Sequence, residues 1–174
     1  AYLGLQKGIN LIANAIRPTL GPCPRFVAVA HSLRHRPPEL LDNGAVIARR
    51  IIQLPDRDAD MGAMYIRHVL MHVHEQVGDG TATAAVLLQS VYNQGVRYVI
   101  AGGNPMSLRR YLEKGAQTIF AKLTEMTIRP EGQEQLARIA GTICYDPPLA
   151  KLLGEIFGVI GEYGRLEIRI GRGR

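Results

Sequence analysis

Apolar residues recur along most of this chain at the spacing of an α-helix. In the first segment they stand at positions 5, 9, 12 and 16, which share one helix face. Arg17-Pro18 follows, and because a proline disfavours the α conformation in the residue before it, we expect this helix to end near Ile16. Further helices are predicted over residues 58–76, 84–101, 104–127, 131–140 and 148–160.

The predicted helix 58–76 mixes apolar residues and histidines around its circumference, so we expect it to be buried on more than one face. Its predicted core methionines are Met61, Met64 and Met71. His68 and His72 share a face, but neither a cysteine cluster nor the H-E-x-x-H order accompanies them. We therefore interpret these two residues and His74 as packed or surface histidines.

Short apolar runs predict a small amount of β-structure. Residues 26–30 and 39–41 are expected to pair as a hairpin, which ends at a turn formed by Asp42-Asn43-Gly44. Residues 166–170 alternate between apolar and charged side chains, as in a strand with one exposed face. The fold class predicted by these patterns is mainly α, with a β-hairpin appended to the helices.

Composition and charge exclude several classes of protein. Of the 174 residues 47% are hydrophobic, which argues against disorder, and no run of about 18 apolar residues predicts a membrane span. The net charge is +6, but the basic residues are dispersed, so we expect neither a nucleic acid nor a membrane as partner. A basic helical domain that associates with nucleic acid stays open as another class. Cys23 and Cys144 lack C-x-x-C spacing, which favours a reduced, cytoplasmic protein.

Residues 77–88 read Val-Gly-Asp-Gly-Thr-Ala-Thr-Ala-Ala-Val-Leu-Leu. Two glycines flank Asp79, and hydroxyl side chains open the helix that follows. Backbone N–H groups at a helix start bind anions, and a carboxylate beside them can hold the metal counter-ion of a nucleoside triphosphate. The same residue types also form a helix end, a tight turn and a new helix start without any ligand.

Several segments, taken in order, resemble the group I chaperonins of the GroEL type. The matching segments are residues 19–22, 42–49, 61–63, 78–83, 101–106 and 141–143. The resemblance covers essentially the whole chain and about the first third of a complete family member. It implies a mainly α, multihelical half of the ATP-binding equatorial domain at residues 1–128. Residues 129–174 would be the first leg of the α/β intermediate domain, and the apical client-binding domain would be missing.

The resemblance also implies the cofactors ATP and Mg²⁺ and the residues that contact them. The implied nucleotide contacts are Thr19, Leu20, Gly21, Pro22, Asn43, Gly44, Gly80, Thr81, Ala82 and Thr83, and the implied metal ligand is Asp79. Glycines admit a close approach of the backbone, and a helix beginning near residue 81 presents unpaired N–H groups to phosphate. No catalytic residue is assigned.

Three departures from the family pattern bear on hydrolysis. Asn43 stands where the family has a carboxylate, and an amide offers neither a base nor a full negative charge. Ala82 replaces a threonine and removes a hydroxyl donor, and Pro24 removes a backbone N–H from the first loop. We therefore do not expect these residues alone to hydrolyse ATP.

The implied function is ATP-dependent protein folding by the complete form of a divergent chaperonin or chaperonin-like protein. Polypeptide clients, a co-chaperonin and assembly into a ring would belong to that complete form. For the fragment we expect a dimer or higher self-association, because half a domain exposes apolar surface. A truncated, non-catalytic paralogue that acts as a scaffold or interaction module is the alternative.

Overall fold

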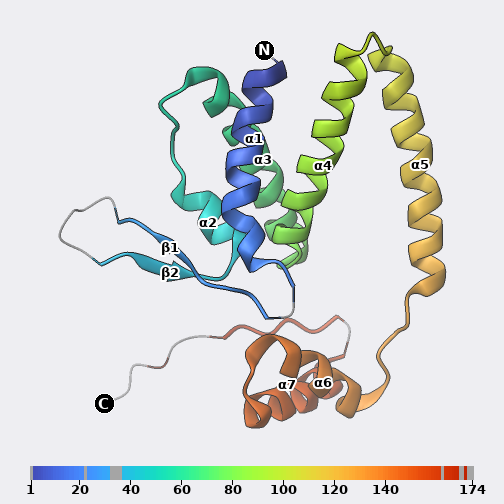
Figure 1. The fold of residues 1–174 in the computed structure, drawn as a ribbon. Helices are drawn as coiled ribbons and strands as arrows, with labels where there is room; N and C mark the ends of the chain where they lie inside the picture. Colours follow the sequence, from blue (N-terminus) through green and yellow to red (C-terminus); the bar gives the residue numbers. More distant parts are fainter. Residues whose placement is uncertain (1, 22, 32–36, 162, 169–170, 172–174) are drawn as a thin grey trace. The chain divides into compact units, whose positions relative to one another are not determined.

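Helices account for most of the structure, a computed structural model that describes residues 2–21, 23–31, 37–161, 163–168 and 171 (Figure 1). The α-helices are α1 (Tyr2–Ile16), α2 (Gly44–Arg50), α3 (Arg57–Val77), α4 (Thr81–Ile100), α5 (Pro105–Met126), α6 (Gly132–Cys144) and α7 (Pro147–Ile160). A short 3₁₀ turn, η1 (Arg17–Thr19), follows α1, and the strands are β1 (Val27–Val29) and β2 (Glu39–Leu41). The predicted mainly α fold with a small hairpin is confirmed. No described helix combines the length and the apolar character that a bilayer span requires.

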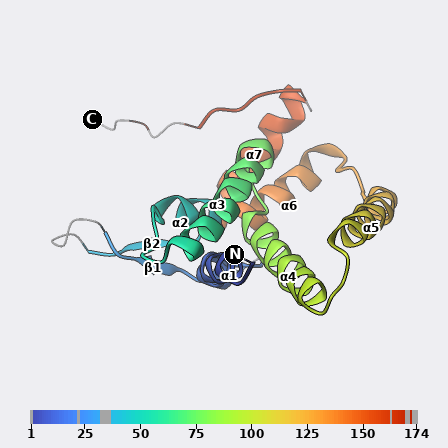
Figure 2. The same ribbon diagram turned by 90° about the horizontal axis from the view of Figure 1, so that it is seen from above.

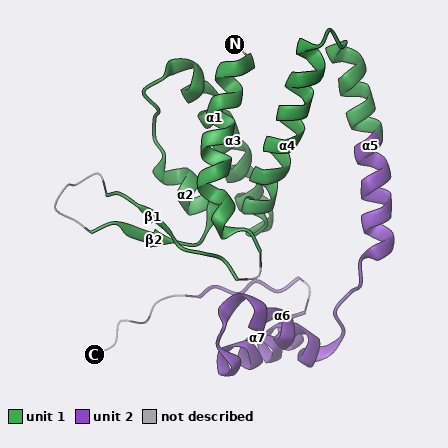
Figure 3. Ribbon diagram, in the orientation of Figure 1, with its two compact units in different colours: residues 1–114 green, residues 115–174 purple. Residues whose placement is uncertain are grey.

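The chain forms two compact units, residues 1–114 and residues 115–174 (Figure 3). The division falls within α5, none of whose side chains is buried. The domain boundary predicted at residue 128 stays a prediction. The candidate site described below lies wholly in the first unit.

The core of the first unit lies where α1, α3 and α4 pack together, with α2 against them (Figures 1 and 2). Its largest fully buried side chains include Ile9, Ile12, Ile16, Ile66 and Leu70. Full burial of one such side chain contributes about 1.5–3 kcal/mol. The predicted end of the first helix at Ile16 is confirmed, because α1 passes there into the 3₁₀ turn.

Glycines bring the backbones of α1 and α3 into direct contact. A β-carbon at Gly8 would overlap the carbonyl oxygen of Ala59 and would lie 2.6 Å from the nitrogen of Ala63. A β-carbon at Gly62 would overlap the carbonyl oxygen of Leu5. The two helices therefore approach more closely than any residue with a side chain permits at these positions.

The prediction that α3 is buried on more than one face is wrong. Its fully buried residues form one stripe: Ala59, Gly62, Ala63, Ile66 and Leu70. Met61 lies about 100° round the helix from Gly62, and its side chain is 58% exposed, so its assignment to the core is also wrong. Met64 does pack against the core. His68 and His72 are exposed, and Nδ1 of His74 is buried without a hydrogen-bond partner in the described structure.

The hairpin pairs β1 with β2 in antiparallel register, with Val27 opposite Leu41 and Val29 opposite Glu39. Arg50, at the end of α2, donates two hydrogen bonds to the Glu39 carboxylate at 2.7 and 2.8 Å. These bonds lower the pKa of that carboxyl and tie the hairpin to α2. The turn predicted at residues 42–44 is in fact the start of α2, a helix that the sequence patterns do not predict.

In the second unit, α6 and α7 form an antiparallel pair. Gly154 allows the close packing, because a β-carbon there would lie 2.6 Å from the carbonyl oxygen of Gln133. The Asp146 side chain caps α7 by accepting a hydrogen bond from the Leu149 amide at 3.1 Å. The strand predicted at residues 166–170 is wrong for residues 166–168, which have no partner strand in the described chain. Residues 169 and 170 lie outside the described residues.

Candidate nucleotide-binding site

The start of α4 is a helix N-terminus without a capping side chain. Gly78 ends α3 with φ 80° and Gly80 precedes α4 with φ 79°, both in the left-handed region that favours glycine. The Ala84 amide donates to the Gly80 carbonyl at 2.9 Å, which is the first backbone bond of the helix. The amides of residues 81–83 therefore have no partner within the helix, and such a terminus attracts anions.

Gly44 brings the start of α2 against the start of α4. A β-carbon on this buried glycine would lie 2.7 Å from Cγ2 of Ile16, 3.0 Å from Oγ1 of Thr81 and 3.4 Å from the amide nitrogen of Ala82. Three segments that are distant in sequence therefore meet here: the end of α1, the start of α2 and the start of α4. A larger residue at position 44 would push them apart.

Asn43 is the N-cap of α2. Its Oδ1 accepts hydrogen bonds from the Ala45 amide at 2.9 Å and from the Val46 amide at 3.3 Å. This is the ordinary helix-capping role of asparagine, which satisfies otherwise unpaired amides. The side chain predicted to contact nucleotide is thus exposed beside Gly44, with its oxygen engaged in the helix.

The segment after α1, residues 17–21, makes a tight bend that we call the elbow. The Leu20 amide donates to the Arg17 carbonyl at 3.1 Å, and the Thr19 hydroxyl donates to the Ile16 carbonyl at 2.8 Å. Thr19 is only 6% exposed, so it fixes the elbow from inside. Leu20 and Gly21 are exposed, and Gly21 has φ 102°. Pro22, also a predicted contact, lies outside the described residues.

Asp79 is exposed on the loop between α3 and α4, and its Oδ1 accepts a hydrogen bond from the Gly80 amide at 2.6 Å. In the described part of the chain no three His, Cys, Asp or Glu side chains group closely enough to hold a metal ion. Mg²⁺ is commonly held by one or two carboxylates together with substrate phosphates. The donor set therefore fits a magnesium ion that arrives with a nucleotide.

The predicted site residues serve different purposes in the structure. Thr81 is buried with its hydroxyl facing Gly44, so it offers its backbone amide rather than its side chain. Thr83 is exposed and Ala82 packs partly on the core. Besides α2, the structure contains a hydrogen-bonded set of polar residues between α1 and α4 that the sequence patterns do not predict: Gln6, Asn10, Asn14, Gln89 and Asn93. Their spacing of four residues within each helix is the signal that could have revealed them.

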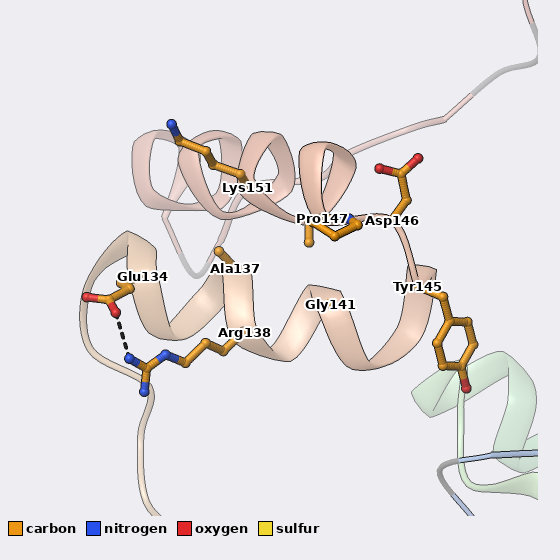
Figure 4. A pocket seen from close by; sticks show the side chains of 9 residues that line it. Glu134, Ala137, Arg138, Gly141, Tyr145, Asp146, Pro147 and Lys151 are labelled. Atoms are coloured by element: carbon orange, nitrogen blue, oxygen red, sulfur yellow. Dashed lines mark hydrogen bonds and ion pairs between the residues drawn. The ribbon is translucent and has the colours of Figure 1, made fainter.

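The second unit has a groove of about 490 Å³ between α6 and α7 (Figure 4). Arg138 and Glu134 form an ion pair at 2.6 Å beside it, and small residues such as Ala137, Gly141 and Ala150 line it. None of the predicted nucleotide contacts lies in this groove.

Comparison with known proteins identifies the family. The TCP-1/cpn60 chaperonin family matches residues 12–146. The probable chaperonin-like protein PrmG of Gordonia sp. (strain TY-5) is 42% identical over 140 residues, which cover 80% of this chain and 35% of that protein. The chaperonin gp146 of bacteriophage EL 2 (Pseudomonas aeruginosa), crystallised in the presence of ATP-BeFx, superposes with a TM-score of 0.72 and 20% identity. That match covers 91% of this chain and 28% of gp146.

This chain therefore belongs to the TCP-1/cpn60 chaperonin family. The resemblance stated from its sequence motifs is confirmed. The chain spans 35% of the length of PrmG and 28% of the length of gp146.

Proposed function

We propose that the start of α4 binds ATP with Mg²⁺, in a chaperonin-like protein whose complete form folds polypeptide clients in the cytoplasm. Residues 1–128 would be the N-terminal half of the equatorial domain, and residues 129–174 the first leg of the intermediate domain. The observation that carries this proposal is the uncapped N-terminus of α4 beside Gly44. The crystallisation of gp146 in the presence of ATP-BeFx supports it.

In this proposal the backbone does most of the binding. The amides of residues 81–83 donate to phosphate oxygens, and the exposed Thr83 hydroxyl adds a side-chain donor. Asp79 shares the Mg²⁺ ion with the phosphates. Leu20 and Gly21 of the elbow also contact the nucleotide, and Thr19 holds the elbow in place through its hydrogen bond to the Ile16 carbonyl. Pro22, the other predicted contact, lies outside the described residues.

Self-association belongs to the same proposal. Helix α5 buries none of its residues, although much of its surface is apolar. Its exposed large apolar side chains are Met106, Tyr111, Leu112, Ile119, Phe120, Leu123 and Met126. Exposed apolar side chains of this kind favour association, so the 174-residue chain forms a dimer or larger assembly and the complete form a ring with a co-chaperonin.

Mg²⁺-ATP is expected to raise the melting temperature of the chain. At a hundred times the dissociation constant, a ligand that binds only the native state stabilises it by about 2.7 kcal/mol. Asp79→Asn should lose the magnesium-dependent part of this shift. The amide oxygen of an asparagine still accepts the hydrogen bond from Gly80, so the loop itself is preserved. The melting temperatures of the wild type and Asp79→Asn are measured by thermal unfolding without ligand, with ATP and with Mg²⁺-ATP. If ATP leaves the melting temperature unchanged, the alternative is favoured, in which the chain is a scaffold or interaction module that does not bind nucleotide.

Hydrolysis of ATP is expected to be slow, and Asn43→Asp should accelerate it by at least about tenfold, because a carboxylate acts as a base where an amide does not. Aspartate caps a helix as well as asparagine does, so α2 is retained. Steady-state phosphate release from the longest form that can be expressed is the measurement. Asn43→Ser, which caps the helix without a carboxylate, is the matched control. Equal, rapid release by the wild type and Asn43→Asp would refute this prediction.

A further inference from the structure

A row of hydrogen-bonded polar side chains runs between α1 and α4. We call this row the polar seam. Its members are Gln6, Asn10, Asn14 and Arg17 from the first segment, and Gln89 and Asn93 from α4. Hydrogen bonds are directional whereas apolar contacts are not, so the seam fixes how far one helix can slide along the other.

Gln89 is the centre of the seam and is 6% exposed. Its Oε1 accepts a hydrogen bond from Nη2 of Arg17 at 2.6 Å. Its Nε2 donates to Oδ1 of Asn10 and to Oδ1 of Asn14, both at 3.0 Å. Both ends of this buried amide are therefore satisfied, and removing any partner leaves a polar group unpaired at a cost.

The seam has one end close to the candidate site and one end far from it. Gln6 pairs with Asn93 at 2.9 Å, while Arg17 pairs with Gln89, so α1 and α4 run antiparallel. The end of α1 therefore lies toward the start of α4, as Figure 1 also shows. Arg17 is the first residue of the elbow, and Gln89 lies eight residues after Thr81, about 12 Å along the helix.

We infer that Arg17 and Gln89 are positioning residues that hold the elbow in register with the N-terminus of α4. The Arg17 guanidinium is anchored on α4 through Gln89, and the Arg17 carbonyl accepts the hydrogen bond that closes the elbow at Leu20. One side chain thus joins the two segments that the nucleotide must contact together. This inference rests on the proposed function, because it gives the alignment of the elbow with the N-terminus of α4 a role in nucleotide binding.

The test compares Gln89→Leu with Asn93→Leu in the 174-residue chain. Both variants replace an amide of α4 by an apolar side chain of similar size without changing charge, and Asn93 belongs to the far end of the seam. Gln89→Leu should raise the exchange rate of the Leu20 amide hydrogen and the dissociation constant of Mg²⁺-ATP, each by about tenfold. This factor corresponds to about 1.4 kcal/mol, the upper end of the range for one hydrogen bond. Asn93→Leu should change both by less than about twofold when compared at equal overall stability.

Arg17→Met is the second variant, for use if Gln89→Leu does not fold. Arg17 is exposed and its replacement opens no cavity in the core, so we expect the fold to be retained although Oε1 of Gln89 loses its donor. Faster exchange at Leu20 in this variant supports the inference without reference to nucleotide. The inference is overturned if Gln89→Leu and Arg17→Met leave both the exchange rate of the Leu20 amide and the affinity for Mg²⁺-ATP unchanged. It is also overturned if Asn93→Leu changes these two quantities as much as Gln89→Leu does. If the wild type fails to bind ATP, the proposed function is rejected, while the exchange rates still decide whether the seam positions the elbow.

Discussion

Gly8→Ala is expected to lower the free energy of unfolding of the first unit by about 3 kcal/mol, the upper range for overpacking a buried site. The added β-carbon would overlap the carbonyl oxygen of Ala59 and would lie 2.6 Å from the nitrogen of Ala63. Both are backbone atoms of α3, so no side-chain rotation relieves the contact. The two helices must separate, which loosens the packing around Ile9 and Ile66.

Gly95→Ala is the matched control for this prediction, because Gly95 belongs to the same unit as Gly8. Gly95 lies inside α4, and a β-carbon there would lie 3.5 Å from Cδ2 of Leu108, an ordinary van der Waals distance. Alanine is the better helix former by about 0.5–1 kcal/mol, so the same substitution should stabilise the helix slightly. Urea unfolding followed by circular dichroism gives both values. Similar changes in the two variants would mean that the close approach of α1 and α3 is not what requires glycine at position 8.

Local sequence signals predict the helices well where one apolar face dominates. The run at positions 5, 9, 12 and 16 with the following Arg17-Pro18 predicts both the existence of α1 and its end. The same reasoning fails at α2, because a turn and a helix start require similar residues. Asn43-Gly44 is typical of a tight turn, yet here the asparagine caps a helix of seven residues.

Burial within a helix depends on its neighbours and is harder to predict. Helix α3 carries apolar side chains around its whole circumference, but α1 packs only on the stripe that contains Gly62 and Ile66. Met61 is left exposed because no described segment covers its side. Residues 166–168 have the alternation of a strand, but a strand forms only where a second strand supplies its hydrogen bonds.

In the candidate site, too, the local structure could be predicted from the sequence, whereas contacts between distant segments could not. The Gly-Asp-Gly-Thr sequence predicts a helix start near residue 81, and α4 begins at Thr81, three residues before the start at residue 84 that periodicity predicts. The sequence alone does not reveal that the Thr81 hydroxyl faces Gly44, or that the Thr19 hydroxyl bonds to Ile16. Both hydroxyls hold segments together, so in our proposal Thr81 contacts phosphate through its backbone amide rather than its hydroxyl.

Thr83→Glu is expected to stabilise the fold and abolish nucleotide binding at the same time. Position 83 is the third residue of α4 and is exposed, so a carboxylate there should stabilise the helix N-terminus by about 0.3–1 kcal/mol. The same carboxylate would occupy the position proposed for a phosphate oxygen. Repulsion between like charges about 4 Å apart near a protein surface amounts to roughly 4 kcal/mol, so the affinity for Mg²⁺-ATP should fall by at least about a hundredfold.

Ser90→Glu is the control for the change in net charge, because it adds the same charge as Thr83→Glu at a position away from the helix N-terminus. Ser90 is exposed on the same helix but lies well beyond its first turn, where the helix terminus no longer acts on a charge. Melting temperatures with and without Mg²⁺-ATP distinguish the variants. Thr83→Glu should melt higher than the wild type without nucleotide and show no shift with it, whereas Ser90→Glu should keep the full shift. A full ATP-dependent shift in Thr83→Glu would place the nucleotide away from the N-terminus of α4, because a phosphate bound to those amides cannot tolerate the added carboxylate.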